Sequence, residues 1–195
     1  MDACLSKYKQ EFGGAYDVYR NHCLRVLSFA RYILITESGF SDAQVQRAMP
    51  LMEVALAYHD MGLFTDLTLE YLDPSAARAE RDLKDTLSAD DLLLVQNIIL
   101  WHHKVSPWSG ADVEGNAIVN AVRKGDWIDA TTCLFGGAFV RKGVSSGNIV
   151  AAHTDLPEMG FGKFLMAIMP WGSYASKLNP GLSFRRLGAL SIFKF

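Results

Sequence analysis

The sequence predicts an all-α protein, a compact bundle of helices that forms a single domain over residues 1–195. Apolar residues recur every three or four positions in several segments, which is the spacing of one face of a helix. Serine and aspartate residues that commonly cap helices precede two of these segments, and short breaks separate them. Strand patterning is weak throughout. A helical bundle is therefore the expected architecture.

The first half of the chain predicts two long helices. One runs from Asp17 to Ile35 and ends before Ser38-Gly39; its apolar positions are Val18, Leu24, Val26, Leu27, Ala30, Ile33 and Leu34. The other follows the N-cap candidates Ser41 and Asp42 and continues towards residues 59 and 60. Pro50 is expected in a first turn or between two helices, and Gly62 is expected to end the segment.

Three further helices are predicted downstream. Residues 75–84 carry alternating charge on an exposed helix. Residues 88–91 cap an apolar helix that runs to position 103, and a loop with Pro107, Gly110 and Gly115 follows. Another helix reads from Asn116 to about Leu134. This core covers about residues 16–135, and a C-terminal extension, 136–195, is helical or irregular. Its apolar segment 161–171 is interpreted as core helix or as the contact of a homodimer.

Composition limits the classes of function. Half of the 195 residues are hydrophobic and the formal net charge is −2, so the chain can bury a sizeable core but has no global basic field for nucleic-acid polymers or anionic membranes. Three cysteines with no CxxC spacing indicate neither a disulfide framework nor a cysteine zinc site. The sequence has no apolar run of eighteen residues and no signal-like N-terminus, which predicts a cytoplasmic protein without a membrane span.

Polar residues inside the apolar helices are the main functional signal: His22, His59, Asp60, His102, His103 and Asp126. Burying a carboxylate beside an imidazole costs several kcal/mol unless both groups are compensated, and a metal ion would compensate both. Imidazole nitrogen and carboxylate oxygen together suit divalent Zn, Mn, Fe, Co or Ni. Two histidines and two aspartates leave coordination positions open, where water can be activated.

The order His…His-Asp…Asp on successive helices resembles the HD superfamily of metal-dependent phosphohydrolases. Three stretches carry the resemblance: Tyr19-Arg20-Asn21-His22-Cys23-Leu24-Arg25-Val26, His59-Asp60-Met61-Gly62, and Ile98 to His103 followed by Lys124 to Ala130. It covers roughly residues 16–135. Trp127, where an arginine is frequent, and Lys124-Gly125 depart from the pattern.

The resemblance implies that the metal ligands are His22, His59, Asp60 and Asp126. Arg25 lies one turn after His22 on the same face and is expected to contact an anionic substrate oxygen or to form a surface ion pair. Asp129 is expected to accept a hydrogen bond from a ligand histidine or to be an exposed carboxylate.

His102 and His103 decide how many ions the site would hold. A single ion is favoured, with one of these histidines acting as a proton donor or phosphate contact. Two ions bridged by Asp60 are the alternative. Lys104 is a candidate phosphate contact or a solvated lysine. Trp101, Trp108 and Trp127 either line a pocket for a flat group or pack in the core.

The resulting functional hypothesis is a hydrolase that cleaves a small phosphate ester or a nucleotide through a metal-activated water. Asp60, Arg25, His102 and His103 are its candidate catalytic residues, and Arg25 and Lys104 its candidate substrate contacts. The same ligand set also occurs with other reactions in the superfamily, so a lyase or hydratase and a di-iron oxygenase are alternatives. A non-catalytic nucleotide-binding domain is the third hypothesis.

Overall fold

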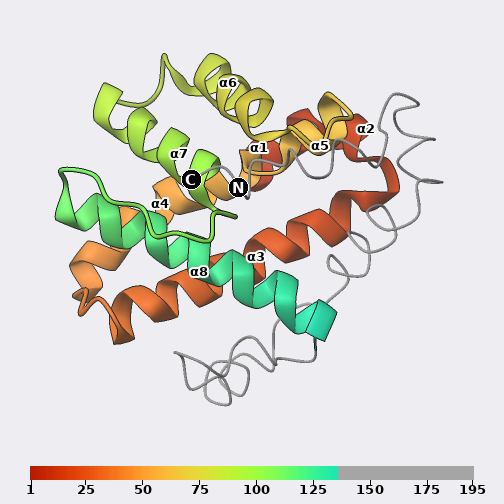
Figure 1. Ribbon diagram of the computed structural model, residues 1–195. Coiled ribbons are helices and arrows are strands. Elements are labelled where there is room, and N and C mark those ends of the chain that lie inside the picture. The colour runs from red at the N-terminus through yellow and green to blue at the C-terminus, as the bar shows by residue number, and fades with distance from the viewer. Residues whose placement is uncertain (136–195) are drawn as a thin grey trace.

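The computed structural model describes the backbone of residues 1–135 and the side chains of residues 1–130. Within this part of the chain all regular structure is helical, which confirms the predicted all-α fold (Figure 1). His153 and segment 161–171 lie outside the described residues. The elements are α1 (Asp2–Lys7), α2 (Lys9–Phe12), a 3-10 turn η1 (Gly13–Ala15), α3 (Tyr16–Thr36), α4 (Asp42–Tyr58), α5 (Met61–Thr65), α6 (Leu72–Leu83), α7 (Ala89–Trp101) and α8 (Val113–Phe135).

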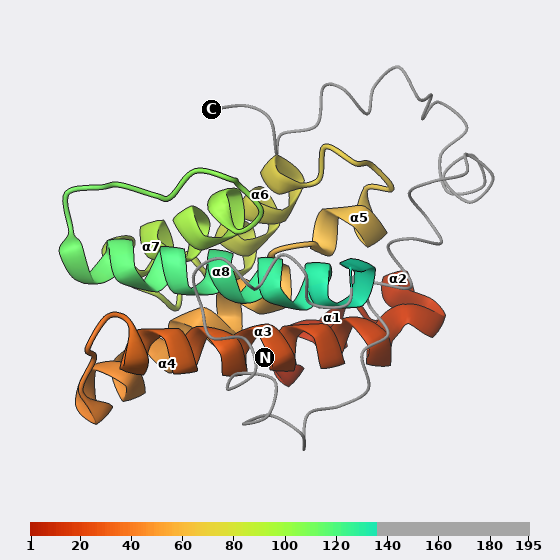
Figure 2. The same ribbon diagram turned by 60° about the horizontal axis from the view of Figure 1, so that its bottom comes forward.

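The two longest helices, α3 and α8, lie side by side and form the centre of the bundle (Figures 1 and 2). Helix α4 packs on α3, and α7 packs on both α4 and α8. Gly125 of α8 allows a close approach to α3, since a Cβ there would lie 2.9 Å from the Val26 carbonyl oxygen. Buried apolar side chains from all four helices fill the interior.

Helices α4 and α7 begin as the sequence predicts, at serine caps. The Ser41 hydroxyl accepts a hydrogen bond from the Gln44 N–H while the Gln44 side chain accepts one from the Ser41 N–H, which is a full capping box. The Ser88 hydroxyl accepts a hydrogen bond from the Asp91 N–H. Each cap satisfies N–H groups that the first helical turn leaves without a partner.

Two predicted breaks are wrong. Pro50 lies inside α4, and the helix continues through it because its buried face, with Val45, Met52 and Leu56, is held by packing. Gly115 belongs to α8 rather than to the preceding loop. Its N–H donates to the Asp112 carboxylate at 2.8 Å, so the helix starts earlier than its apolar pattern indicates.

The break between α4 and α5 falls at His59-Asp60 itself and not at Gly62, which corrects the predicted role of that glycine. Gly62 lies within α5, where its N–H donates to the Ser75 hydroxyl at 2.9 Å. A Cβ at position 62 would lie 2.6 Å from the Tyr71 carbonyl oxygen. Glycine is therefore needed here so that the start of α6 can pack against α5.

The N-terminal helices α1 and α2, which the sequence patterns did not predict, cover one end of the bundle. Leu5 and Phe12 are buried, and the Tyr8 hydroxyl donates to the Asp82 carboxylate of α6 at 2.6 Å. None of the helices in the described part of the chain combines the length and apolar character needed to cross a membrane.

Candidate metal centre

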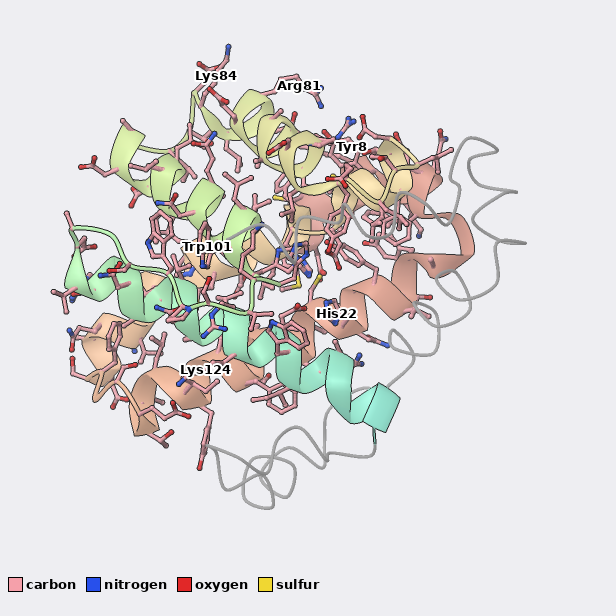
Figure 3. The ribbon with its side chains drawn as sticks, viewed as in Figure 1. Tyr8, His22, Arg81, Lys84, Trp101 and Lys124 are labelled. Carbon is pink, nitrogen blue, oxygen red and sulfur yellow. The ribbon has the colours of Figure 1, made fainter. Side chains whose placement is uncertain are left out.

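Five of the polar residues singled out in the sequence meet in the interior. His22 comes from α3, His59 and Asp60 from the break between α4 and α5, His102 from the end of α7, and Asp126 from α8. Their exposed fractions lie between 0 and 8 %. In Figure 3 His22 lies in the middle of the molecule, whereas Arg81 and Lys84 extend from its edge. Segments up to 104 residues apart in the chain thus build one cluster.

Three side chains of this cluster, those of His22, His59 and Asp126, are spaced like the ligands of one ion, and Asp60 lies beside them. His22 Nε2 lies 3.1 Å from His59 Nε2 and 3.2 Å from Asp126 Oδ1. Asp60 Oδ2 lies 3.3 Å from His59 Nε2 and 3.9 Å from His22 Nε2. Ligands at 2.0–2.2 Å around a tetrahedral zinc ion are about 3.4 Å apart. His22, His59 and Asp126 could therefore hold a divalent ion, and the Asp60 carboxylate is close to two of them, His22 and His59.

The hydrogen bonds of the histidines show which ring nitrogens face the centre. His59 Nδ1 lies 2.7 Å from the Leu56 carbonyl oxygen, and His22 Nδ1 lies 2.7 Å from Asp129 Oδ2. Both partners are acceptors, so each Nδ1 donates to its partner and each Nε2 faces the other ring. Two unprotonated nitrogens 3.1 Å apart would repel each other, so either a proton or a metal ion is expected between them, and the raised pKa of His22 favours a proton when no ion is bound.

The charges of the cluster also call for a cation. Arg25 balances the carboxylate of Asp129, which leaves the carboxylates of Asp60 and Asp126. Asp60 Oδ1 is buried and accepts no hydrogen bond within residues 1–130, although His102 Nε2 is 3.2 Å away. Burial opposes ionisation of Asp60, but His59 and His102 outweigh it and hold its pKa below the usual range. Two buried negative charges match one divalent ion or, when none is bound, protons on His22 and His102, whose pKa values the nearby carboxylates raise against the effect of burial.

His22 is oriented by a buried ion pair. Both Asp129 oxygens accept hydrogen bonds from Arg25, from Nε at 2.6 Å and from Nη2 at 2.9 Å, and Oδ2 also accepts from His22 Nδ1. Burial opposes a positive charge on His22, but Asp126 and Asp129 outweigh it and raise its pKa to about 9. The predicted hydrogen bond from a ligand histidine to Asp129 is confirmed. The ion pair predicted for Arg25 is present, although in the core and not at the surface.

Tyr19 is a contributor that the sequence analysis missed. Its ring stacks on His59 with centroids 5.6 Å apart, and its hydroxyl accepts a hydrogen bond from the Asp60 N–H at 3.2 Å. These contacts fix the chain at the break that carries two ligands. Its position three residues before His22, on the same helix face, is the signal that could have identified it.

His103 and Lys104 are buried at the edge of the cluster. His103 Nδ1 is hydrogen-bonded to the Tyr71 hydroxyl at 2.7 Å, and burial lowers its pKa, with further contributions from His102 and Lys104. The Lys104 ammonium lies 5.9 Å from the centre of the Trp101 ring. Tyr71 is the second contributor that no sequence pattern indicated.

A pocket of about 340 Å³ adjoins this edge, between the start of α6, the end of α7 and the loop after α7. Trp101 and Trp108 line it, whereas Trp127 does not. The Trp127 indole N–H instead donates to the Lys104 carbonyl at 3.3 Å. Two of the three tryptophans thus occupy the predicted pocket-lining position, and the third secures the loop.

Comparison of the chain with protein-family models, with curated proteins and with solved structures gives no match. The function must therefore be argued from the buried histidines and aspartates themselves.

Proposed function

We propose that the protein is a metal-dependent phosphohydrolase of the HD type that acts on a small phosphate ester. The observation that carries the proposal is the pair of His22 and His59 Nε2 atoms, 3.1 Å apart and flanked by two buried carboxylates. A nitrogen and oxygen donor set of this kind suits Zn, Mn, Fe, Co or Ni. The resemblance in motif order adds to this argument.

Four residues would hold the ion: His22, His59, Asp60 and Asp126. A divalent ion there supplies Lewis acidity, which lowers the pKa of water towards 7 and offsets charge on phosphate oxygens. Asp129 keeps the proton of His22 on Nδ1, and the Leu56 carbonyl does the same for His59. The protein thus prepares its ligands before any ion arrives.

The edge with Lys104, His102 and His103 is where a phosphate would meet the protein. Lys104 would compensate a phosphate oxygen, and one of the two histidines would donate a proton to the leaving oxygen. In the contacts that the structure describes, the Arg25 guanidinium binds the Asp129 carboxylate. We therefore favour a positioning role for Arg25 over the substrate contact that the sequence also allows.

A second candidate function follows from Asp60 Oδ1, which lies 3.2 Å from His102 Nε2. His102 Nδ1 is directed at the Ile99 carbonyl at 2.7 Å, so its Nε2 faces Asp60 and could bind an ion once it gives up its proton. His59, Asp60 and His102 form a second group that could hold an ion, with His59 shared between this group and that of His22, His59 and Asp126. Two irons in this arrangement would favour oxygenase chemistry, whereas one zinc or manganese ion favours hydrolysis or hydration.

Elemental analysis of the purified full chain by plasma emission is the first test, followed by phosphate release from p-nitrophenyl phosphate and nucleoside monophosphates. We expect one Zn or Mn per chain and hydrolysis that a chelator abolishes. Asp126→Ala should lose the ion, whereas Asp85→Ala, at an exposed position, should keep it. A wild-type protein that takes up no ion would refute the proposal, and two irons with visible absorption would favour the oxygenase.

A further inference from the structure

The pocket beside the metal centre has walls of two chemical kinds. Leu72, Leu100 and the indoles of Trp101 and Trp108 form its apolar part. Its polar part comes from four side chains: Glu70, Asp73, Asn97 and Lys104. Aromatic walls with a few polar groups are typical of a small-molecule site, and a volume of about 340 Å³ is enough for a small metabolite.

This pocket is separated from the metal centre by one pair of side chains. Tyr71 and His103 are hydrogen-bonded to each other, and the Tyr71 ring lies 6.1 Å from the ring of His102. The pocket residues Leu72 and Lys104 directly follow these two in the chain. A molecule in the pocket would therefore reach the metal centre past the Tyr71–His103 pair.

The charges of the pocket are distributed unequally between its walls. Lys104 follows the metal-centre residues His102 and His103, and its ammonium is close to the Trp101 ring. Glu70 and Asp73 lie at the start of α6, and neither carboxylate forms an ion pair within residues 1–130. The α7 wall thus offers a positive charge and the α6 wall two negative charges.

We propose, on the basis of the proposed phosphohydrolase function, that this pocket selects phosphate monoesters of amino alcohols. The phosphate would lie towards Lys104 and the metal centre, and the ammonium group would lie between the carboxylates of α6 and the indole faces. Hydrolysis cleaves the P–O ester bond, and one water molecule supplies the hydroxyl to phosphorus and the proton to the amino alcohol. A second anionic group or a neutral base would lack a partner at Glu70 and Asp73.

The test compares two esters of nearly equal size, O-phosphoethanolamine and ethylene glycol monophosphate. The first carries an ammonium group where the second carries a hydroxyl group. We expect kcat/KM of the metal-loaded full chain to be about tenfold higher for phosphoethanolamine, since the ammonium gains charge-assisted hydrogen bonds. Equal values for the two esters, or a preference for adenosine monophosphate over both, would overturn the proposal.

Matched variants locate the source of the preference. Asp73→Asn should reduce kcat/KM for phosphoethanolamine severalfold and leave that for ethylene glycol monophosphate unchanged. Asp85→Asn makes the same change of charge at an exposed position beyond α6, outside the pocket, and should change neither value. An equal effect of both variants on kcat/KM would show that the overall electrostatic field of the protein causes the preference, and this would refute the assignment of the preference to the pocket.

A binding measurement separates this proposal from the function it rests on. Calorimetric titration of the metal-free protein with each ester requires no turnover, and we expect phosphoethanolamine to bind more tightly. Preferential binding that Asp73→Asn removes, without hydrolysis by the loaded protein, would support the pocket and refute the phosphohydrolase. Hydrolysis of both esters without preferential binding would support the phosphohydrolase and refute the pocket.

Discussion

The ends of α4 and α7 are built alike, although 43 positions separate His59 from His102. Each histidine is the C-cap of its helix, with φ −56° and ψ −38° at His59 and φ −54° and ψ −35° at His102. In each case Nδ1 lies 2.7 Å from the carbonyl oxygen three residues earlier. The same local device therefore directs two imidazole Nε2 atoms at one point.

The two helix ends differ in the residue that follows. After His59, Asp60 turns its carboxylate into the cluster, and its N–H is held by Tyr19. After His102, the imidazole of His103 is bonded to Tyr71 beside the pocket. A helix end can thus position a histidine reproducibly, while the residue after it lies in the buried His/Asp cluster in one case and beside the pocket in the other.

Substitution of Asp60 and of His103, the residues that follow the two C-cap histidines, should give the largest difference in bound metal. Asp60→Ala removes the carboxylate that lies between His59 Nε2 and His102 Nε2, and we expect loss of the bound ion and a fall in phosphatase activity of about a thousandfold or more. His103→Ala should keep the ion. Plasma emission and circular dichroism provide the measurements, and full metal occupancy in a helical Asp60→Ala protein would contradict the assignment.

Exchange of the two C-cap histidines for alanine should separate their roles next. His59→Ala should lose the ion, because His59 Nε2 is close to three other ligand atoms. His102→Ala should retain one ion per chain and lose about 10- to 100-fold in kcat, as expected for a proton donor. If wild type binds two ions and His102→Ala binds one, the site is dinuclear.

Asp129→Asn tests the hydrogen bond that orients the third histidine, His22. The Nδ1 of this histidine is bonded to a carboxylate, whereas that of His59 and of His102 faces a backbone carbonyl. We expect a 10- to 100-fold weaker affinity for the ion, since a partner that fixes the ring is lost. Removal of one member of a buried ion pair also destabilises proteins by about 3–5 kcal/mol. Competition with a chelator dye measures the affinity, and thermal unfolding of the apo protein measures the stability. Unchanged affinity would mean that Asp129 serves stability alone.

Tyr71→Phe should have the smallest effect of the four. It removes the hydroxyl bonded to His103 and keeps the ring, so metal content should not change and kcat should fall only a few-fold. Steady-state kinetics beside elemental analysis would show this. Loss of the ion on this substitution would place Tyr71 within the metal centre and not at its edge.

The sequence predicted the long helices and the residues of the buried His/Asp cluster because both depend on short-range patterns. The spacing of apolar residues in α3 and the serine caps of α4 and α7 are local, and His22, His59, Asp60 and Asp126 are conspicuous as polar residues in apolar segments. What the sequence did not reveal depends on distant partners. Tyr19 and Tyr71 read as ordinary aromatic residues until the fold brings them to His59 and His103.

The interpretation of glycines failed for the same reason. Gly62 and Gly115 read as helix breaks from the sequence, yet both lie within helices, where Gly62 admits the Tyr71 backbone and the N–H of Gly115 bonds to Asp112. The helix break that directs the side chains of His59 and Asp60 into the cluster occurs at these two residues themselves, and Asp60 has φ −110° and ψ 8°. Tertiary contacts with Tyr19 impose it, and no breaker residue marks it.

The close contact at Gly125 has a consequence for the choice of ion. Gly125 precedes Asp126, and Val26, whose carbonyl it nearly touches, lies one turn after His22. The separation of the α3 and α8 axes at this point therefore sets the 3.2 Å between His22 Nε2 and Asp126 Oδ1. Gly125→Ala would move the helices apart and enlarge the coordination space. If an ion binds here, the small residue at position 125 would favour ions of small radius over larger ones such as calcium.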